Sequence, residues 1–142
     1  MAHIPSFPGV HFGFEAINEL PGELKDRGVD RPLVITDQGL VEHGVCQQLL
    51  DALPADIKVS VFDNIPENPT IAGVEGALAV YQENNCNGII GLGGGSVLDS
   101  GKALRVATNL DLSVIEILND LSKVTADVAP YITIPTTAGT GA

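Results

Sequence analysis

The sequence predicts an α/β fold in which a Rossmann-like parallel sheet is flanked by helices. Short apolar runs alternate with helical patterns of roughly ten to fifteen residues, as expected for βαβ units on a parallel sheet. The apolar runs are rich in β-branched residues and close with glycine or turn residues, which is typical of buried strands. With 142 residues, the chain suits one domain that buries about two-thirds of its unfolded surface.

The first elements are expected at the start of the chain. Residues 3–14 are apolar, contain two prolines and predict a short edge strand that ends at Gly13. Residues 15–27 carry apolar side chains at helical spacing and predict a helix. Pro21 is expected to open a second segment of that helix, and Gly28 to end it.

A strand, a helix and a second strand are expected next. Residues 33–36 predict a short buried strand closed by Asp37. Residues 39–53 place apolar side chains on one face and predict a helix that Pro54 terminates. In residues 57–61 apolar and polar residues alternate, so this strand is expected to be half exposed at a sheet edge.

The remaining elements follow from turn residues and periodicity. The expected order is a loop over residues 63–70, an amphipathic helix over 71–81, a buried strand over 88–92, a helix to about residue 109, a strand or helix over 113–118, and a strand over 131–134. No internal repeat or low-complexity tract interrupts this order.

A run of three glycines, Gly93, Gly94 and Gly95, separates the strand over 88–92 from the next helix. Such a turn lets an anionic group approach the backbone, where a helix N-terminus offers free N–H groups and partial positive charge. We interpret it as a cradle for the pyrophosphate of a dinucleotide. The alternative is a capping box formed by Ser96 and Asp99, which needs no ligand. The run fits neither the G-x-G-x-x-G fingerprint nor the P-loop.

Three segments with functional residues each come directly after a predicted strand. They are Asp37, residues 93–96 and residues 136–141. Ligands of parallel sheets bind beyond the carboxyl ends of the strands. We therefore expect the three segments to converge on one crevice.

Asp37 is a candidate ligand for the adenosine ribose, because a carboxylate accepts both ribose hydroxyls and repels a 2′-phosphate. That interpretation makes the cofactor NAD rather than NADP. The alternative is an Asx turn or helix cap before Gly39.

Small hydroxyl residues and glycines fill the segment 136–141, which suits phosphate, ribose or amide binding, although a plain turn is the alternative. Asp99 and Lys102 are spaced for a surface ion pair of at most ~0.5 kcal/mol, or Asp99 reaches the nucleotide. The three histidines show no metal-ligand spacing, and no combination of residues indicates nucleophilic catalysis.

Composition narrows the possible partners. The net charge of -11, from seven basic and eighteen acidic residues, argues against nucleic acid and against an anionic membrane surface. A hydrophobic content of 44% argues against disorder. Cys46 and Cys86 are expected to be core thiols, and the sequence shows neither a signal peptide nor a membrane span. A cytoplasmic location is expected.

These segments together resemble the N-terminal half of an iron-containing (group III, metal-dependent) alcohol dehydrogenase. The matching segments are Phe12-Gly13-Phe14, Val34-Ile35-Thr36-Asp37, Val61-Phe62-Asp63, Glu67-Asn68-Pro69-Thr70, Gly93-Gly94-Gly95-Ser96 with Asp99 and Lys102, and Ile134-Pro135-Thr136-Thr137-Ala138-Gly139-Thr140-Gly141. The related glycerol and dehydroquinate-synthase-type enzymes share the triple glycine but match the last segment less well.

The resemblance implies residue roles and a two-domain dehydrogenase. Gly94, Gly95, Ser96 and Asp99 would hold the pyrophosphate and Asp37 the ribose, while Asn68, Thr136, Thr137 and Thr140 would line the rest of the NAD cleft. Residues 1–142 would be the NAD-binding domain. The ligands of Fe²⁺ or Zn²⁺ would belong to a helical second domain absent from this chain.

The expected function is the cofactor-binding part of an NAD-dependent enzyme that interconverts small primary alcohols and aldehydes, with a homodimer among the expected assemblies. Whether it is a truncated copy, a fragment or one part of a split enzyme, the chain is expected to be inactive alone. The alternatives are a non-catalytic nucleotide-binding module, a glycerol dehydrogenase-type relative and a degraded remnant.

Overall fold

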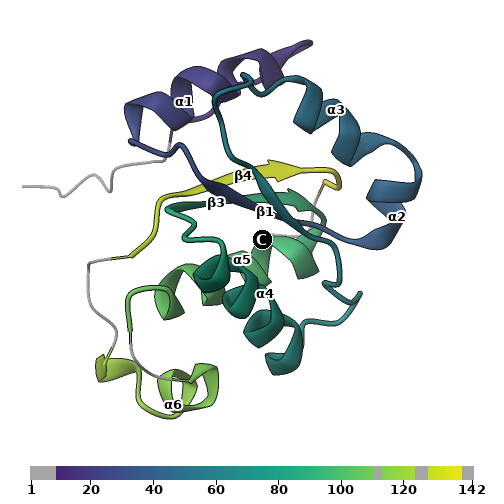
Figure 1. The fold of residues 1–142 in the computed structure, drawn as a ribbon. Coiled ribbons are helices and arrows are strands. Elements are labelled where there is room, and N and C mark those ends of the chain that lie inside the picture. The colour runs from purple at the N-terminus through teal and green to yellow at the C-terminus, as the bar shows by residue number, and fades with distance from the viewer. Residues whose placement is uncertain (1–8, 111–112, 124–127, 139–142) are drawn as a thin grey trace, which may run out of the picture.

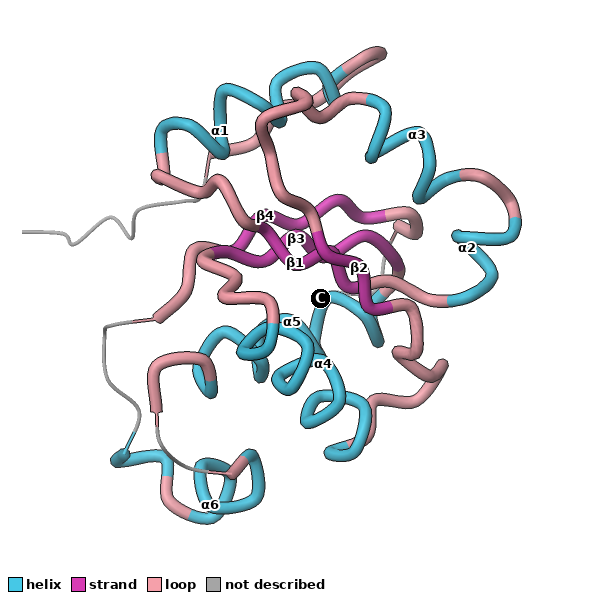
Figure 2. The backbone as a smooth tube through the Cα atoms, viewed as in Figure 1, coloured by secondary structure: helices cyan, strands magenta, loops and turns pink. Residues whose placement is uncertain are grey.

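The computed structural model describes residues 9–110, 113–123 and 128–138. Four parallel strands form one sheet in the order β2-β1-β3-β4 (Figure 2). The strands are β1 (Pro32–Ile35), β2 (Ser60–Phe62), β3 (Gly88–Gly93) and β4 (Tyr131–Pro135). The predicted parallel α/β fold is therefore confirmed, with β2 at the edge position expected for its alternating sequence.

Helices cover both faces of the sheet (Figure 1). One face carries α1 and α3, and the other carries α4, α5 and α6. The helical elements are η1 (Ala16–Glu19), α1 (Leu20–Asp26), α2 (Gln38–Glu42), α3 (Val45–Asp51), α4 (Ile71–Glu83), α5 (Gly95–Ala107), α6 (Val114–Asn119) and η2 (Leu121–Lys123).

The core consists of two apolar layers separated by the sheet. Successive strand side chains point to opposite faces. Leu33 and Ile35 of β1 therefore pack against α4 and α5, whereas Val34 between them packs against α1 and α3. Burial on both sides explains why β1 and β3 are continuously apolar.

Two expectations from the first part of the chain are wrong. Residues 9–14, the described part of the expected strand over 3–14, form no strand, and Phe12 and Phe14 are exposed. Their apolar composition suggested a strand, but composition does not supply a neighbouring strand to pair with. The expected helix over 39–53 is divided into α2 and α3, because Gly44 adopts φ 78° and ends the regular helical path.

Other expectations are confirmed. Pro21 lies in the first turn of α1, where its missing N–H is harmless. The ambiguous segment 113–118 is helical, because Ser113 and Glu116 form a capping box at the start of α6. Cys46 and Cys86 are buried free thiols, and burial raises the pKa of both.

Among the described residues, no helix is long and apolar enough to cross a bilayer.

Glycines allow α5 to lie close to the sheet. A Cβ on Gly91 of β3 or on Gly101 of α5 would come within 2.4 Å or 2.1 Å of the Tyr131 hydroxyl oxygen. The ring of Tyr131 thus occupies the space that these two side chains would need. Its hydroxyl donates to the Leu98 carbonyl (2.8 Å), and burial raises its pKa well above the usual range, so it remains a donor. This contact fixes α5 on β3 and β4.

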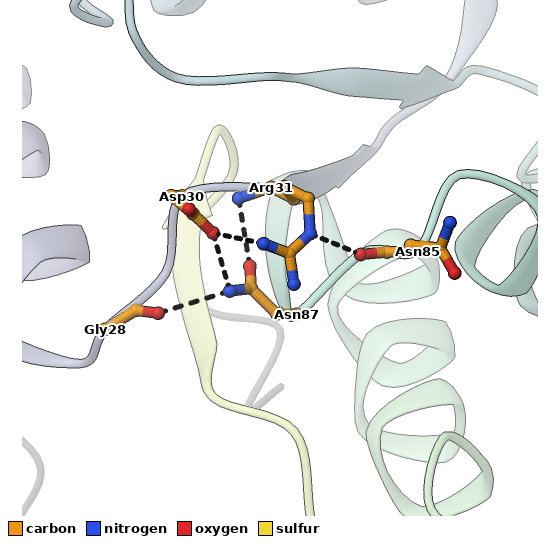
Figure 3. Close-up of polar contacts among 5 residues, drawn as sticks. All are labelled: Gly28, Asp30, Arg31, Asn85 and Asn87. Carbon is orange, nitrogen blue, oxygen red and sulfur yellow. Dashed lines mark hydrogen bonds and ion pairs between the residues drawn. The ribbon is translucent and has the colours of Figure 1, made fainter.

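A polar network joins the starts of β1 and β3 (Figure 3). The Asn87 side chain accepts from the Arg31 backbone N–H (2.9 Å) and donates to the Gly28 carbonyl (3.2 Å) and to Asp30 (2.8 Å). The Arg31 guanidinium donates to Asp30 (2.8 Å) and to the Asn85 carbonyl (2.7 Å). Asn87 therefore closes the edge of the sheet opposite the carboxyl ends of the strands.

We expect Asn87→Ala to lower the free energy of unfolding by about 1–3 kcal/mol, because the partly buried Arg31 N–H and two exposed acceptors lose their partner. Urea denaturation measures this loss. Asn84→Ala is the matched control, since the Asn84 side chain makes one exposed bond to the Val80 carbonyl (3.0 Å). Equal losses in the two variants would contradict the role assigned to Asn87.

Candidate functional site

A cleft of about 730 Å³ lies at the carboxyl ends of the strands. The loops after all four strands line it. The lining residues are Asp37, Gln38, Gly39, Leu40 and His43 after β1, Asp63, Asn64, Ile65, Pro66 and Glu67 after β2, Gly94, Gly95, Ser96 and Val97 after β3, and Thr136 and Thr137 after β4. The expected convergence of Asp37, the glycine run and the last segment on one crevice is confirmed.

Strand order explains why the cleft forms at this place. The chain passes from β1 outward to β2 and then returns across β1 to β3 and β4. The connections on either side of the β1–β3 boundary therefore leave the sheet toward opposite faces. Topological switch points of this kind open a crevice between the two loops, and doubly wound sheets bind their ligands there.

The N-terminus of α5 faces this cleft. The helix begins at Gly95, its N-cap is Gly94, and no side chain caps it. The first N–H bonded back within the helix belongs to Leu98, which donates to the Gly94 carbonyl (3.0 Å). The N–H groups of residues 95–97 have no intrahelical acceptor, and the helix dipole adds positive potential there. This end of α5 suits an anion.

The capping-box alternative for Ser96 and Asp99 is wrong. Ser96 lies inside the first turn of α5, and its hydroxyl donates to the Glu67 carbonyl in the loop after β2. The reason is that the N-cap is Gly94, so the helix starts two residues earlier than the capping pattern requires. Asp99 consequently lies beyond the first turn, where it pairs with Lys102 (3.1 Å) at a half-exposed position.

Asp37 is the N-cap of α2. Its Oδ1 accepts from the Leu40 N–H (2.9 Å), so the cap that the sequence offered as an alternative is present. The carboxylate also lines the cleft. Because the cap engages Oδ1 alone among the described contacts, the two roles of Asp37 are compatible.

The threonines after β4 complete the opposite wall. Thr136 continues the ladder, with its N–H donating to the Gly93 carbonyl (2.9 Å). Thr137 lies against Gly94, where an added Cβ would come within 3.3 Å of its hydroxyl oxygen. The glycine therefore leaves room for Thr137 beside the start of α5. Among the other predicted residues, Asn68 and Asp99 do not line the cleft, and Thr140 lies outside the described residues.

Two residues that line the cleft, Gln38 and His43, were not predicted as site residues from the sequence. Gln38 donates to Asn64 (2.9 Å) and joins α2 to the loop after β2. His43 lines the cleft with its Nδ1 donating to the Gly39 carbonyl (2.7 Å), since a carbonyl only accepts. Neither residue belongs to a sequence motif that would have marked it.

The charge of the cleft is unusual for an anion site. Asp37, Asp63 and Glu67 line it, and none of its described lining residues is lysine or arginine. An anion must therefore be held by N–H groups, hydroxyls and the α5 dipole. No group of three or more His, Cys, Asp or Glu within the described residues can hold a metal ion, so we assign no metal chemistry to them.

The sheet is parallel and has a ligand-sized cleft at its switch point, next to the N-terminus of α5 with its glycine N-cap. These features define a Rossmann-like doubly wound domain. The sequence profile described as iron-containing alcohol dehydrogenase matches residues 8–142. The chain belongs to the iron-containing alcohol dehydrogenase family, as its motifs suggested.

Characterised relatives agree with this assignment. The chain is 38% identical to 4-hydroxybutyrate dehydrogenase from Cupriavidus necator, over 99% of this chain and 37% of the relative. It is 35% identical to lactaldehyde reductase from Escherichia coli (strain K12), over 92% of this chain and 35% of the relative. The chain thus spans little more than a third of the length of these relatives.

A solved structure shows the same fold. Sulfoacetaldehyde reductase from Bifidobacterium kashiwanohense, determined in complex with NAD⁺, superimposes with a TM-score of 0.81 at 29% identity. The match covers 91% of this chain and 34% of that protein. The Rossmann-like architecture is therefore shared with a family member that binds the dinucleotide.

Proposed function

We propose that residues 1–142 form the NAD-binding domain of a metal-dependent alcohol dehydrogenase that interconverts small primary alcohols and aldehydes. The observation that carries the proposal is the single cleft shared by Asp37, the glycine run and the threonines after β4. When bound, NAD would accept or return the hydride. The relatives described above are alcohol dehydrogenases and reductases, so they do not favour a glycerol dehydrogenase-type alternative.

The proposed roles follow the geometry of the cleft. The N–H groups at Gly95 and Ser96 hold the pyrophosphate, with Gly94 leaving space for its approach. The free carboxylate oxygen of Asp37 accepts the adenosine ribose hydroxyls. Thr136 and Thr137 lie where the rest of the cofactor would extend, and Asn68, Asp99 and Thr140 remain proposed contacts by family resemblance.

Iron is the metal that the family name indicates, and it fits this account better than zinc. The described residues offer no ligand set for it. We therefore place metal and alcohol binding outside the described residues, in the part of the family length that the match does not cover. In this proposal, residues 1–142 bind the NAD cofactor.

Isothermal titration of the 142-residue chain with NAD tests the proposal, alongside a turnover assay with NAD, ferrous ion and short primary alcohols. We expect saturable binding and no turnover. Binding absent at millimolar NAD would overturn the assigned function. Robust turnover would overturn the placement of metal and alcohol outside these residues.

Asp37→Gly is expected to shift cofactor preference from NAD toward NADP by about tenfold or more, because the repulsion of the 2′-phosphate is removed. Glycine at an N-cap costs only a few tenths of a kcal/mol, so α2 remains formed. The ratio of the two dissociation constants measures the shift. Asp37→Asn keeps the cap without the charge and should give a smaller shift. An unchanged ratio in both variants would leave Asp37 as a helix cap alone.

A further inference from the structure

Thr36 is a fully buried polar residue at the point where β1 and β3 separate. Pairing between these strands ends with Ile35 opposite Gly91. A parallel ladder continued by one step would offer the N–H of Asp37 to the Leu92 carbonyl. Instead, the Thr36 hydroxyl donates to that carbonyl (2.8 Å). The side chain takes the place of the next main-chain bond.

The Thr36 backbone is bonded in the other direction. Its N–H donates to the Phe62 carbonyl (2.9 Å), and its carbonyl accepts from the Ile65 N–H (3.4 Å) in the loop after β2. One residue therefore joins the ends of three strands. Asp37, which follows Thr36, and Gly93, which follows Leu92, lead directly into two of the loops that line the cleft.

We propose that Thr36 is a positioning residue of the cofactor site, an inference that rests on the proposed function. Its hydroxyl satisfies the buried Leu92 carbonyl while the main chain leaves the sheet at Asp37. The end of β1 can then diverge from β3 without leaving a buried acceptor unpaired. The hydroxyl thereby sets the separation between Asp37 and the start of α5. That separation decides whether the ribose can reach Asp37 while the pyrophosphate lies at the start of α5.

Thr36→Val removes the hydroxyl and keeps the shape of the side chain. We expect the dissociation constant for NAD to rise about tenfold, the size of one lost buried hydrogen bond, in a chain that still folds. Thr36→Ser should restore native affinity. Thr108→Val is the matched control, because the Thr108 hydroxyl donates to the Arg105 carbonyl (2.9 Å) at the far end of α5. It should lower stability and leave NAD affinity unchanged.

Amide hydrogen exchange on the unliganded chain separates this inference from the assigned function. Thr36→Val should lose protection at the Ile65 amide and at the Leu98 amide, the first hydrogen-bonded amide of α5, whereas Thr108→Val should not. If the native chain fails to bind NAD but this local loss occurs, the assigned function falls and the positioning role stands. Native exchange at these amides in Thr36→Val, or native NAD affinity in that folded variant, would overturn the inference.

Discussion

Gly94→Asp is expected to raise the dissociation constant for NAD by a factor on the order of 100 or more while the chain stays folded. Gly94 is the N-cap of α5 and already has the extended backbone (φ -84°, ψ -168°) that capping residues adopt. An aspartate there would accept hydrogen bonds from the free N–H groups of the first turn. It would also place a negative charge where the pyrophosphate is proposed to bind. Helix stability and cofactor binding should therefore change in opposite directions.

Isothermal titration with NAD and thermal denaturation measure the two effects on Gly94→Asp. Among the described residues, the new Cβ comes close to the Thr137 side chain, at 3.3–3.4 Å, and this side chain can shift slightly. Gly94→Asn is the matched control, because asparagine caps as well as aspartate without the charge. It should weaken binding less. Native affinity in the aspartate variant would show that the cofactor does not use this end of α5.

Gly101→Ala is expected to lower the free energy of unfolding by about 2–3 kcal/mol, although alanine is the better helix former. The new Cβ would lie 2.1 Å from the Tyr131 hydroxyl oxygen and 2.3 Å from Cζ of the ring, so α5 or β4 must move. Chemical denaturation measures the loss.

Gly22→Ala is the matched control for that substitution. Gly22 lies in α1, and a Cβ added there meets open space, since no other part of the described chain comes within 4 Å of it; alanine should therefore raise stability by up to about 1 kcal/mol. Combining Gly101→Ala with Tyr131→Ala should lose less than the sum of the two single changes, because removal of the ring makes room for the methyl group. Strict additivity would contradict the packing described here.

Much of the fold was predictable because its two central strands, β1 and β3, are buried on both faces. β1 and β3 appear as short apolar runs for that reason, and once parallel strands are assumed, residues such as Asp37 and Thr137 must share one edge. The expected crevice follows from this topology. It did not require knowledge of any single side-chain contact.

The errors come from features that periodicity does not record. The break at Gly44 depends on one left-handed residue inside an otherwise helical pattern. The α5 helix starts two residues earlier than a cap at Ser96 would require, so Ser96 donates to the loop after β2 instead of capping the helix. The pattern over residues 33–36 predicts Thr36 only as the end of a strand, although a hydroxyl in a buried run requires a hydrogen-bond partner and is therefore a usable signal.

Backbone amide NMR of the chain titrated with NAD tests the central claim, that one cleft at the carboxyl ends of the strands binds the dinucleotide. We expect chemical-shift changes at residues 37–40, 94–97 and 136–137 together. The amides of Gly28 and Asn87, at the opposite edge, should not shift. Saturable shifts at the opposite edge, or shifts confined to one of the three loops, would contradict it.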